Sequence, residues 1–339
     1  MSKEKVRWGI LSAGRIAHRF AEAIKAMEDA ELIAVGSRQI DKAQAFASEY
    51  GIPHAHGSYK SLAADPDVDA IYVSTPHPMH KENSIVCLNA GKAVLCEKPF
   101  TVNSAEASAV IDTARAKGIF LMEAMWTRFL PGLAKVRELI TAGAIGQPRM
   151  LSADFGFRAA FDPTSRLFDP HLGGGSLLDV GVYCVSLASM VFGRPARVAG
   201  LATLGATGVD EQAAWVLGYE NGELALLSSA VRTHTQHEAW INGTDGAIKL
   251  HAPWYAPTRL SLIEPGKGER VIDTPIEGNG FGYQAAEVGA CIRAGKLESD
   301  TLPLEETRSI MRTLDQIRAQ WGLKYPFENA DTIRLTTDV

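Results

Sequence analysis

The stretch GILSAGRIAHRF, residues 9–20, decides the fold. It begins inside an apolar run, VRWGIL (6–11), and leads into a segment with apolar residues at helical spacing, which predicts strand, turn and helix. In the usual dinucleotide fingerprint, Gly-x-Gly-x-x-Gly or Ala, the first glycine permits a tight turn. Here Ser12 takes that place, and Gly14 and Ala17 keep the second and third. A serine can occupy the turn if its φ is negative, and the strand and helix on either side predict a working cofactor loop. The alternative is a Rossmann-like scaffold that has lost its nucleotide.

The pattern of strand and helix continues as far as residue 143. Apolar runs predict strands at 31–37, 70–75, 93–97 and 119–122. Helices are expected at 41–50, 80–90, 103–118 and 131–143. This alternation is typical of a parallel sheet and predicts an N-terminal Rossmann domain over residues 1–124.

Beyond residue 148 the pattern changes to strand-like runs separated by turn sequences. The turns are expected at 220–222, 244–246 and 265–268. Helices are expected after 173–179, near 281–294 and at 303–321. We therefore predict an α/β protein whose C-terminal part, residues 125–339, is an α+β domain with a large, mostly antiparallel open sheet, used for substrate binding and oligomerisation.

Composition limits the possible partners. The 339 residues are 46% hydrophobic and carry a formal charge of -5 without a basic run, which argues against nucleic acid or a membrane as the main partner. Small molecules are the default ligands. The N-terminus lacks a signal-peptide pattern and no stretch approaches about 18 uninterrupted apolar residues, so we expect a cytoplasmic protein. The cysteines are widely spaced and are expected to be buried reduced thiols: Cys87, Cys96, Cys184 and Cys291.

The end of the second predicted strand bears on the choice of cofactor. An acidic residue is typical there in NAD-binding proteins, because it binds the ribose 2′-hydroxyl. This chain has Ser37 and Arg38, with Lys42 one turn further. These residues can neutralise a 2′-phosphate, which favours NADP(H) and makes NAD(H) less expected. The alternative is that Arg38 is only a solvated surface residue.

Five motifs together indicate a known family. They are WGILSAGRIA (8–17), STPHPMH (74–80), LCEKPF (95–100), EAMWTRF (123–129) and GGGSLLDVGVYC (173–184). In order and spacing, over nearly the whole chain, the sequence resembles the Gfo/Idh/MocA oxidoreductases. Within them it is most similar to the dimeric dihydrodiol dehydrogenases, also described as NADP-linked D-xylose 1-dehydrogenases, a subgroup that similarly has a serine before the fingerprint glycine.

This resemblance implies roles for individual residues. Lys98 matches the catalytic lysine and Glu97 would orient it, while Asp179 and Tyr183 match the aspartate and the acid/base residue of the second domain. Most members have histidine where this chain has Tyr183. The aromatic residues expected to line the substrate pocket are Trp126, Phe155, Tyr183 and Trp254. The residues expected to contact the cofactor are Ser12, Gly14, Arg15, Ile16, Ser37, Arg38, Lys42, Thr75, Pro76, His77, His80, Glu97 and Lys98.

The chemistry agrees with these roles, with alternatives for several residues. Oxidation of an alcohol needs a base for the hydroxyl proton, and an ammonium group near Tyr183 would favour its phenolate. Lys98 or Tyr183 could be the final proton donor in reduction. Asp179 could instead be a helix cap, and Trp126 and Trp254 could be core residues. No metal site is expected, because the pair His77 and His80 lacks a third ligand.

These observations lead to an expected function and assembly. We expect an NADP-dependent dehydrogenase acting on a cyclic polyol or an aldopyranose, in which a hydride moves between nicotinamide and a secondary alcohol or hemiacetal carbon. The alternative is a catalytically inactive, cofactor-binding regulator, which would not need Lys98, Asp179 and Tyr183 together. A homodimer or tetramer is expected through an apolar face of the second sheet, with Trp215, Leu217, Leu224, Leu226 and Trp240.

Overall fold

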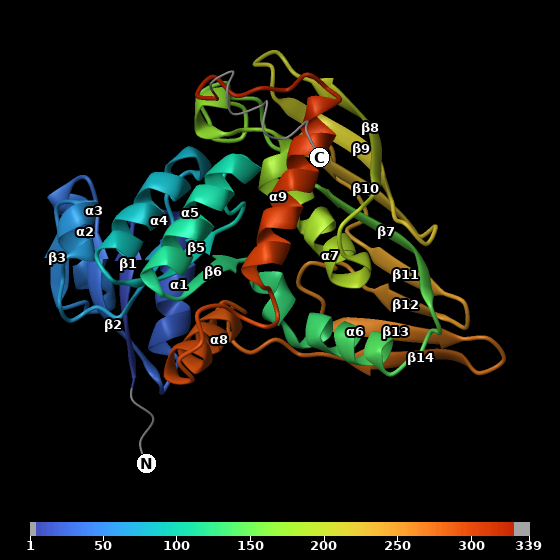
Figure 1. Cartoon of the computed structure of the whole chain (residues 1–339), viewed down its shortest axis with the longest axis horizontal. Helices are drawn as coiled ribbons and strands as arrows, with labels where there is room; N and C mark the ends of the chain where they lie inside the picture. Colours follow the sequence, from blue (N-terminus) through green and yellow to red (C-terminus); the bar gives the residue numbers. More distant parts are fainter. Residues whose placement is uncertain (1–4, 329–339) are drawn as a thin grey trace. The chain divides into compact units, whose positions relative to one another are not determined.

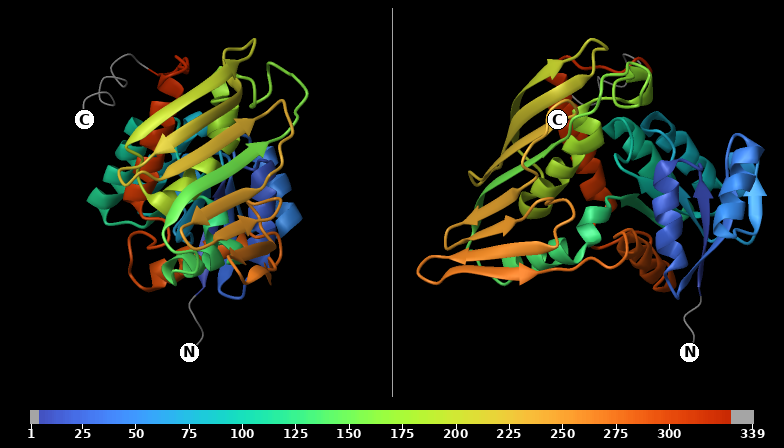
Figure 2. Two further views of the ribbon diagram at one scale, coloured as in Figure 1. Left: turned by 90° about the vertical axis from the view of Figure 1, so that its right-hand side faces the viewer. Right: turned by 180° about the vertical axis from the view of Figure 1, so that it is seen from behind.

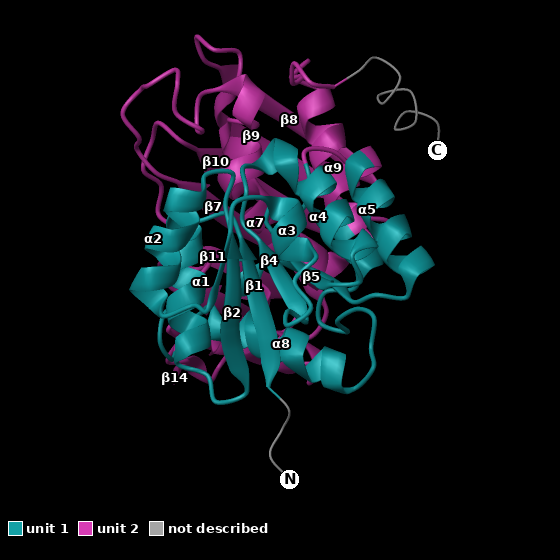
Figure 3. Cartoon of the chain, turned by 90° about the vertical axis from the view of Figure 1, so that its left-hand side faces the viewer, with its two compact units in different colours: residues 1–101, 106–126, 277–307 teal, residues 102–105, 127–276, 308–339 magenta. Residues whose placement is uncertain are grey.

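The computed structural model describes residues 5–328 and divides the chain into two compact units (Figures 1 and 3). Unit 1 comprises 1–101, 106–126 and 277–307, and unit 2 comprises 102–105, 127–276 and 308–339. This division differs from the single boundary predicted after residue 124. The reason is that the segment with helix α8 (Gly282–Arg293) packs on α1 (Arg15–Lys25), where Arg293 forms an ion pair with Asp29 at 2.8 Å.

Unit 1 is a Rossmann domain, as predicted. Its six strands are parallel and lie in the order β3-β2-β1-β4-β5-β6. Their bounds are β1 Val6–Leu11, β2 Ala30–Gly36, β3 His54–His56, β4 Ala70–Val73, β5 Ala93–Glu97 and β6 Leu121–Ala124. The other helices that begin in the first 126 residues are α2 Ile40–Tyr50, α3 Tyr59–Ala63, η1 His77–Met79, α4 His80–Asn89, α5 Ser104–Lys117 and η2 Trp126–Phe129.

Strand β1 lies at the centre of this sheet because almost all of its side chains are apolar and buried. Trp8 packs edge-on against Phe20 of α1 at 5.1 Å between ring centroids, and Phe20 stacks on Tyr72 of β4 at 3.9 Å. The order of strands reverses at β1 and β4, so the loops that follow these strands border the crevice where open α/β sheets bind ligands. Ser74 joins the loops, since its Oγ donates to the carbonyls of Leu11 and Ser12.

The second unit contains an eight-stranded sheet in the order β14-β13-β12-β11-β7-β10-β9-β8. Only β7 and β10 pair in parallel among the described strands of this sheet, which confirms a mostly antiparallel arrangement. The strands are β7 Pro148–Gly156, β8 Arg197–Leu204, β9 Asp210–Gly218, β10 Leu224–Ala230, β11 Ala239–Gly243, β12 Ala247–Leu250, β13 Arg259–Glu264 and β14 Gly268–Asp273. The predicted turns at 220–222, 244–246 and 265–268 are confirmed, because each joins two of these strands.

Helices cover one face of this sheet (Figure 2). They are α6 Pro131–Thr141, the π-helical turn η4 Leu177–Gly181, α7 Val182–Phe192 and α9 Leu304–Ala319; the short helix η3 Pro170–Leu172 precedes η4 in the chain. The stretch Pro170–Phe192 is apolar and long enough to cross a membrane by length and composition, but 78% of its apolar 18-residue window is buried inside the protein, as expected of a core helix. The four cysteines are free and buried, as predicted.

The sheet residues predicted to form an exposed apolar face divide between the two faces. Trp215 and Leu217 are buried on the helix side, where Trp215 lies 6.4 Å from Trp321 between ring centroids, so their assignment to the exposed face is wrong. Leu224 and Leu226 are exposed, as predicted. Side chains alternate between faces along a strand, and β9 and β10 follow this alternation.

Candidate functional site

The loop between β1 and α1 has the geometry of a dinucleotide-binding turn, but Ser12 adopts it at a cost. Its φ is 88°, in the left-handed region that favours glycine, so the expectation of a negative φ is wrong. The backbone N–H of Ser12 donates to the carbonyl of Gly36 at 2.9 Å, which ties the turn to β2. The turn therefore keeps the shape that a glycine would give it, with a serine under backbone strain.

Gly14 has no side chain, so a ligand can approach the backbone at the start of α1. A Cβ built on Gly14 would have only the Ser12 Oγ within 4 Å, at 3.9 Å. Gly14 is also the N-cap of α1, an 11-residue helix whose first N–H groups and dipole favour an anion. Ala17 is fully buried, so the small third residue serves helix and strand packing. The loop therefore fits a pyrophosphate that approaches the backbone closely.

A cavity of about 530 Å³ lies beside this loop. It is lined by Ser12, Ala13, Gly14, Ser37, Arg38, Gln39, Lys42 and Tyr59. Ser37 is buried and its Oγ accepts the N–H of Gln39 at 3.2 Å, while Arg38 and Lys42 are exposed. Two cations and a hydroxyl thus border a cavity next to a helix N-terminus, a donor set that fits a phosphate monoester.

The loop after β4 is held to the loop after β5 through His80. Its Nδ1 lies 2.9 Å from the carbonyl oxygen of Pro99 and its Nε2 lies 2.7 Å from that of Thr75. Burial lowers the pKa of His80, and the charge of Lys98 lowers it further. Both ring nitrogens face carbonyl oxygens, so His80 positions the two loops. The neighbouring ring of His77 lies 5.8 Å away, between centroids.

Lys98 follows directly on β5 in a loop braced by two buried glutamates. Glu97 accepts a short hydrogen bond from the hydroxyl of Tyr72 and another from the backbone N–H of Lys98 at 3.1 Å. Glu123, at the end of β6, accepts the N–H of Phe100 and the hydroxyl of Thr307, each at 3.2 Å. Glu123 was missed by sequence reasoning; the only signal for it was an acidic residue inside the apolar strand that includes Met122.

In the second unit, Asp179 lies in the π-helical turn η4, a feature that is frequent at functional sites. It is buried and forms an ion pair with Arg166, whose Nη1 lies 2.8 Å from Oδ1. Arg166 was missed because it lies 13 residues away in a loop without a recognisable motif. The ion pair orients the carboxylate of Asp179, which goes beyond what a helix cap requires.

Asp210 of β9 holds the start of the same helical segment. Its Oδ2 accepts the hydroxyl of Ser176 and the N–H of Leu177, both at 2.7 Å. Its Oδ1 is buried without a hydrogen-bond partner among the described residues, and burial raises the pKa of Asp210 to about 6. Gly175 makes this approach possible: its φ is 113°, and a Cβ there would lie 2.1 Å from that Oδ1.

Aromatic rings gather around Tyr183, one turn after Asp179. Phe155 lies 5.4 Å from Tyr183 between ring centroids, and Tyr255 stacks on Phe155 at 3.9 Å and 2°. Tyr255 was not predicted; its aromatic neighbour in the sequence, Trp254, was chosen instead. Trp254 is only 1% exposed and its indole N–H donates to the carbonyl of Asp154 at 2.6 Å, as in a core residue. A substrate contact for Trp254 stays a prediction.

The predicted site residues are divided between the two units. The predicted cofactor residues lie in the loops after β1, β2, β4 and β5 of unit 1 or in the elements that border these loops. Trp126 belongs to that unit and stacks on Phe281 at 5.1 Å between ring centroids. The second unit brings together Asp179, Tyr183 and Phe155.

Known proteins resemble this chain over almost its full length. Residues 6–125 match the oxidoreductase family with an NAD-binding Rossmann fold, and residues 133–249 match the GFO/IDH/MocA C-terminal domain. The trans-1,2-dihydrobenzene-1,2-diol dehydrogenase of Mus musculus is 37% identical over 334 residues, covering 95% of this chain and 98% of the relative. That of Xenopus tropicalis is 39% identical over 332 residues, covering 94% and 99%.

Solved structures share the architecture. An aldose-aldose oxidoreductase from Caulobacter crescentus, complexed with glycerol, has a TM-score of 0.85 and 25% identity, covering 94% of this chain and 98% of that one. A 3-ketoreductase from Actinomadura kijaniata, in complex with NADP and TDP-benzene, has a TM-score of 0.81 and 25% identity, covering 93% and 98%. With both domain matches and these relatives, the chain belongs to the Gfo/Idh/MocA oxidoreductase family.

Proposed function

We propose that this oxidoreductase uses NADP(H) and acts on a secondary alcohol or hemiacetal carbon of a cyclic polyol or aldose, such as a trans-dihydrodiol or a pyranose. The observation that carries the proposal is the loop of Lys98. Two buried glutamates and His80 hold this lysine at the carboxyl end of β5, in a domain whose neighbouring loops fit a dinucleotide. Such bracing suits a group that must meet a reacting atom in one position.

The charges around the 530 Å³ cavity support the choice of NADP(H). Arg38 and Lys42 can pair with a 2′-phosphate, and Ser37 can donate a hydrogen bond to it. Among the residues that line this cavity there is no carboxylate that would repel the phosphate or bind a free 2′-hydroxyl. NAD(H) lacks the phosphate and would leave these cations without their partner.

The residues of the chain have separate tasks in the proposed reaction. The bound cofactor accepts or supplies the hydride. Lys98 would hydrogen-bond the reacting oxygen and stabilise the negative charge that develops on it. Tyr183 would take the hydroxyl proton in oxidation, and either residue could return it in reduction. The ion pair with Arg166 orients the carboxylate of Asp179 in the same helical segment.

The substrate class rests on the aromatic rings and the relatives. Phe155, Tyr255 and Tyr183 offer flat apolar walls with hydroxyl groups, which suit a ring bearing adjacent hydroxyls. The curated relatives are named for a trans-dihydrodiol, and one structural relative for an aldose. We infer that both compound classes are worth testing in both directions.

One experiment tests the catalytic proposal. Purified protein is assayed with a panel of aldoses and trans-diols, with either cofactor, by the absorbance of reduced nicotinamide. With any accepted compound, Lys98→Met should lower kcat by about 100-fold or more with little change in cofactor affinity, because the lysine acts mainly in the transition state. The exposed Lys117→Met is the control and should retain wild-type turnover.

Two results would contradict the proposal. Near-normal turnover of Lys98→Met would remove the lysine from the mechanism. Tight cofactor binding without turnover of any compound would favour the cofactor-binding regulator.

We also propose that two copies associate through the face of the second sheet that bears no helix of its own unit. Exposed apolar side chains lie on adjacent strands there, because Leu224 pairs with Met150 and Leu226 pairs with Val216. Leu201 on the next strand is 83% exposed. Contiguous apolar patches of this kind usually mark contacts, and a two-fold pair of such faces would bury them.

A further inference from the structure

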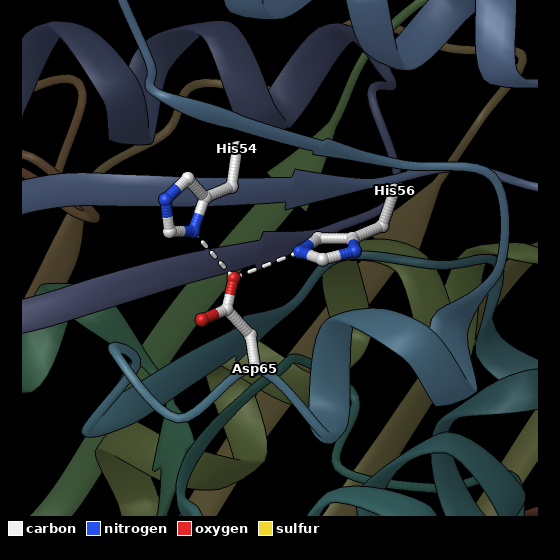
Figure 4. A group of neighbouring side chains, drawn as sticks. All are labelled: His54, His56 and Asp65. Atoms are coloured by element: carbon white, nitrogen blue, oxygen red, sulfur yellow. Dashed lines mark hydrogen bonds and ion pairs between the residues drawn. The ribbon is translucent and has the colours of Figure 1, made fainter.

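Two histidines and an aspartate form a cluster at the edge of the first sheet, apart from the residues discussed above (Figure 4). His54 and His56 are alternate residues of the short strand β3, so their side chains leave the same face. Asp65 follows the helix α3 and points between them. His54 Nδ1 lies 2.7 Å and His56 Nε2 lies 2.8 Å from the same oxygen, Oδ2 of Asp65.

The geometry of the three donors fits a metal ion. Their atoms lie within 4.8 Å of one another. Ligands of tetrahedral zinc, each about 2.0–2.1 Å from the ion, lie roughly 3.3 Å apart. Each imidazole nitrogen would have to move about half an ångström away from the carboxylate oxygen, and the two nitrogens, now within 4.8 Å of each other, would have to settle at a similar spacing, which rotation of the side chains can supply.

A hydrogen bond from the backbone orients the carboxylate of Asp65, as such bonds commonly orient a carboxylate that binds a metal ion. It is only 3% exposed, and its Oδ1 accepts the N–H of Asp67 at 3.0 Å, so that Oδ2 is the oxygen turned toward the two imidazoles. Lys92 braces the loop, since its Nζ donates to the carbonyls of Asp65 and Val68 at 2.6 and 2.7 Å.

The histidines provide access from solvent. The side chain of His54 is 38% exposed and that of His56 is 22% exposed, so an ion can enter and keep water as a further ligand. Two imidazoles and one carboxylate favour zinc and its neighbours among the transition metals, while calcium and magnesium prefer oxygen ligands alone.

We propose that His54 Nδ1, His56 Nε2 and Asp65 Oδ2 bind one divalent transition-metal ion of the zinc class, with solvent completing the coordination. The ion links β3 to the loop after α3. It also fixes one border of the cofactor cavity, because the carbonyl of His56 accepts the N–H of Ser37 at 3.0 Å. The expectation of no metal site considered only His77 and His80, and this cluster revises it.

Direct metal binding tests the proposal. Full-length protein, freed of metal by a chelator that is then removed, is titrated with Co²⁺ and with Zn²⁺. We expect one Co²⁺ per chain with the visible ligand-field bands of a low-coordinate site, displaced by Zn²⁺ and not by Mg²⁺ or Ca²⁺. Zn²⁺ should also raise the thermal midpoint of the wild type.

Ligand variants and a matched control make the result specific. His54→Gln and His56→Gln should each weaken Zn²⁺ binding by more than about 100-fold, because loss of a ligand costs at least as much as loss of its outer-shell partner. His251→Gln, which removes a histidine bonded to Ser261 in the other unit, should bind like the wild type. Circular dichroism verifies that each variant folds. Equal Zn²⁺ affinity and equal thermal shift in His54→Gln, His56→Gln and the wild type would overturn the proposal, as would binding of no ion by the wild type.

Discussion

At the scale of single residues, Ser12 carries the least expected feature of the chain. A left-handed φ of 88° costs a non-glycine residue about 1 kcal/mol, because Cβ crowds the backbone. The fold accepts this strain, since Ser12 is held from both sides, by the Gly36 carbonyl and by the hydroxyl of Ser74. The serine also places its hydroxyl group on the wall of the cofactor cavity.

Comparing two variants at Ser12 measures the strain. At most positions glycine is less stable than alanine, because it loses more conformational freedom on folding. At Ser12 we expect the reverse order, with Ser12→Gly more stable than Ser12→Ala by about 1 kcal/mol, since only alanine retains the strained Cβ. Urea unfolding of both variants without cofactor measures the difference. An alanine variant equal to or more stable than the glycine variant would show that the turn is not strained.

Arg38 decides the choice of cofactor at the same scale. We expect the wild type to bind NADP(H) more tightly than NAD(H), and Arg38→Asp to abolish or reverse this preference, because a carboxylate repels the 2′-phosphate. Fluorescence titration of both cofactors measures the four affinities. Arg194→Asp, which reverses a charge in the other unit, is the control and should keep the wild-type preference. Equal affinity of the wild type for both cofactors would refute the assignment.

At the scale of elements, the start of the helical segment η4–α7 depends on one buried carboxylate. Burial raises the pKa of Asp210 to about 6, above its usual value of 3.8. Between these two values the folded state holds a proton that the unfolded state has released, so the free energy of unfolding falls as the pH rises from about 4 to about 6. A pKa shift of this size changes the free energy of unfolding by on the order of 3 kcal/mol.

The variant Asp210→Asn should remove that dependence. Asparagine keeps an oxygen for Ser176 and Leu177 but does not titrate, so we expect its thermal midpoint to fall less than that of the wild type as the pH rises over this range. Thermal unfolding at several pH values measures both slopes. The exposed Asp273→Asn should follow the wild type. Parallel slopes for Asp210→Asn and the wild type would show that Asp210 titrates normally.

The helices and strands differ in how well the sequence predicts them. The helix α1 and the strand β5 were predicted because one has apolar residues at helical spacing and the other is a continuous apolar run. The short elements β3 and α3 were missed, since three half-buried residues and a five-residue helix carry no period. Their absence from the prediction also concealed the cluster of His54, His56 and Asp65.

Side chains that act through tertiary packing were also beyond sequence reasoning. The motifs identified Lys98 and Asp179 as candidates. Their supports, Glu123 and Arg166, come from a neighbouring strand and from a loop, and only the fold brings them close. Tyr255 could not be preferred to Trp254 on sequence alone, because two adjacent aromatic residues differ only in the direction that the backbone gives them.

At the scale of the whole molecule, one face of the sheet of the second unit exposes apolar side chains that association with a second copy would bury. Alternation sends Trp215 and Leu217 to the helix side and leaves Val216, Leu224 and Leu226 outside. Figure 2 shows this face without a helix of the same unit on it, among the described residues. A solvated sheet normally alternates apolar residues inside with polar residues outside, and here part of the outer set is apolar as well.

A charge placed on that face should separate the copies. Leu226 is 43% exposed and Val216, opposite it on β9, is 39% exposed, so Leu226→Glu puts a carboxylate at the centre of the proposed interface without entering the core. We expect light scattering to give a dimer or tetramer for the wild type and a monomer for Leu226→Glu at micromolar concentration, because an unpaired buried charge costs several kcal/mol. Leu297→Glu, at an equally exposed leucine of the first unit, should keep the wild-type mass. A monomeric wild type would refute the proposal, and an unchanged oligomer in Leu226→Glu would move the interface to another surface.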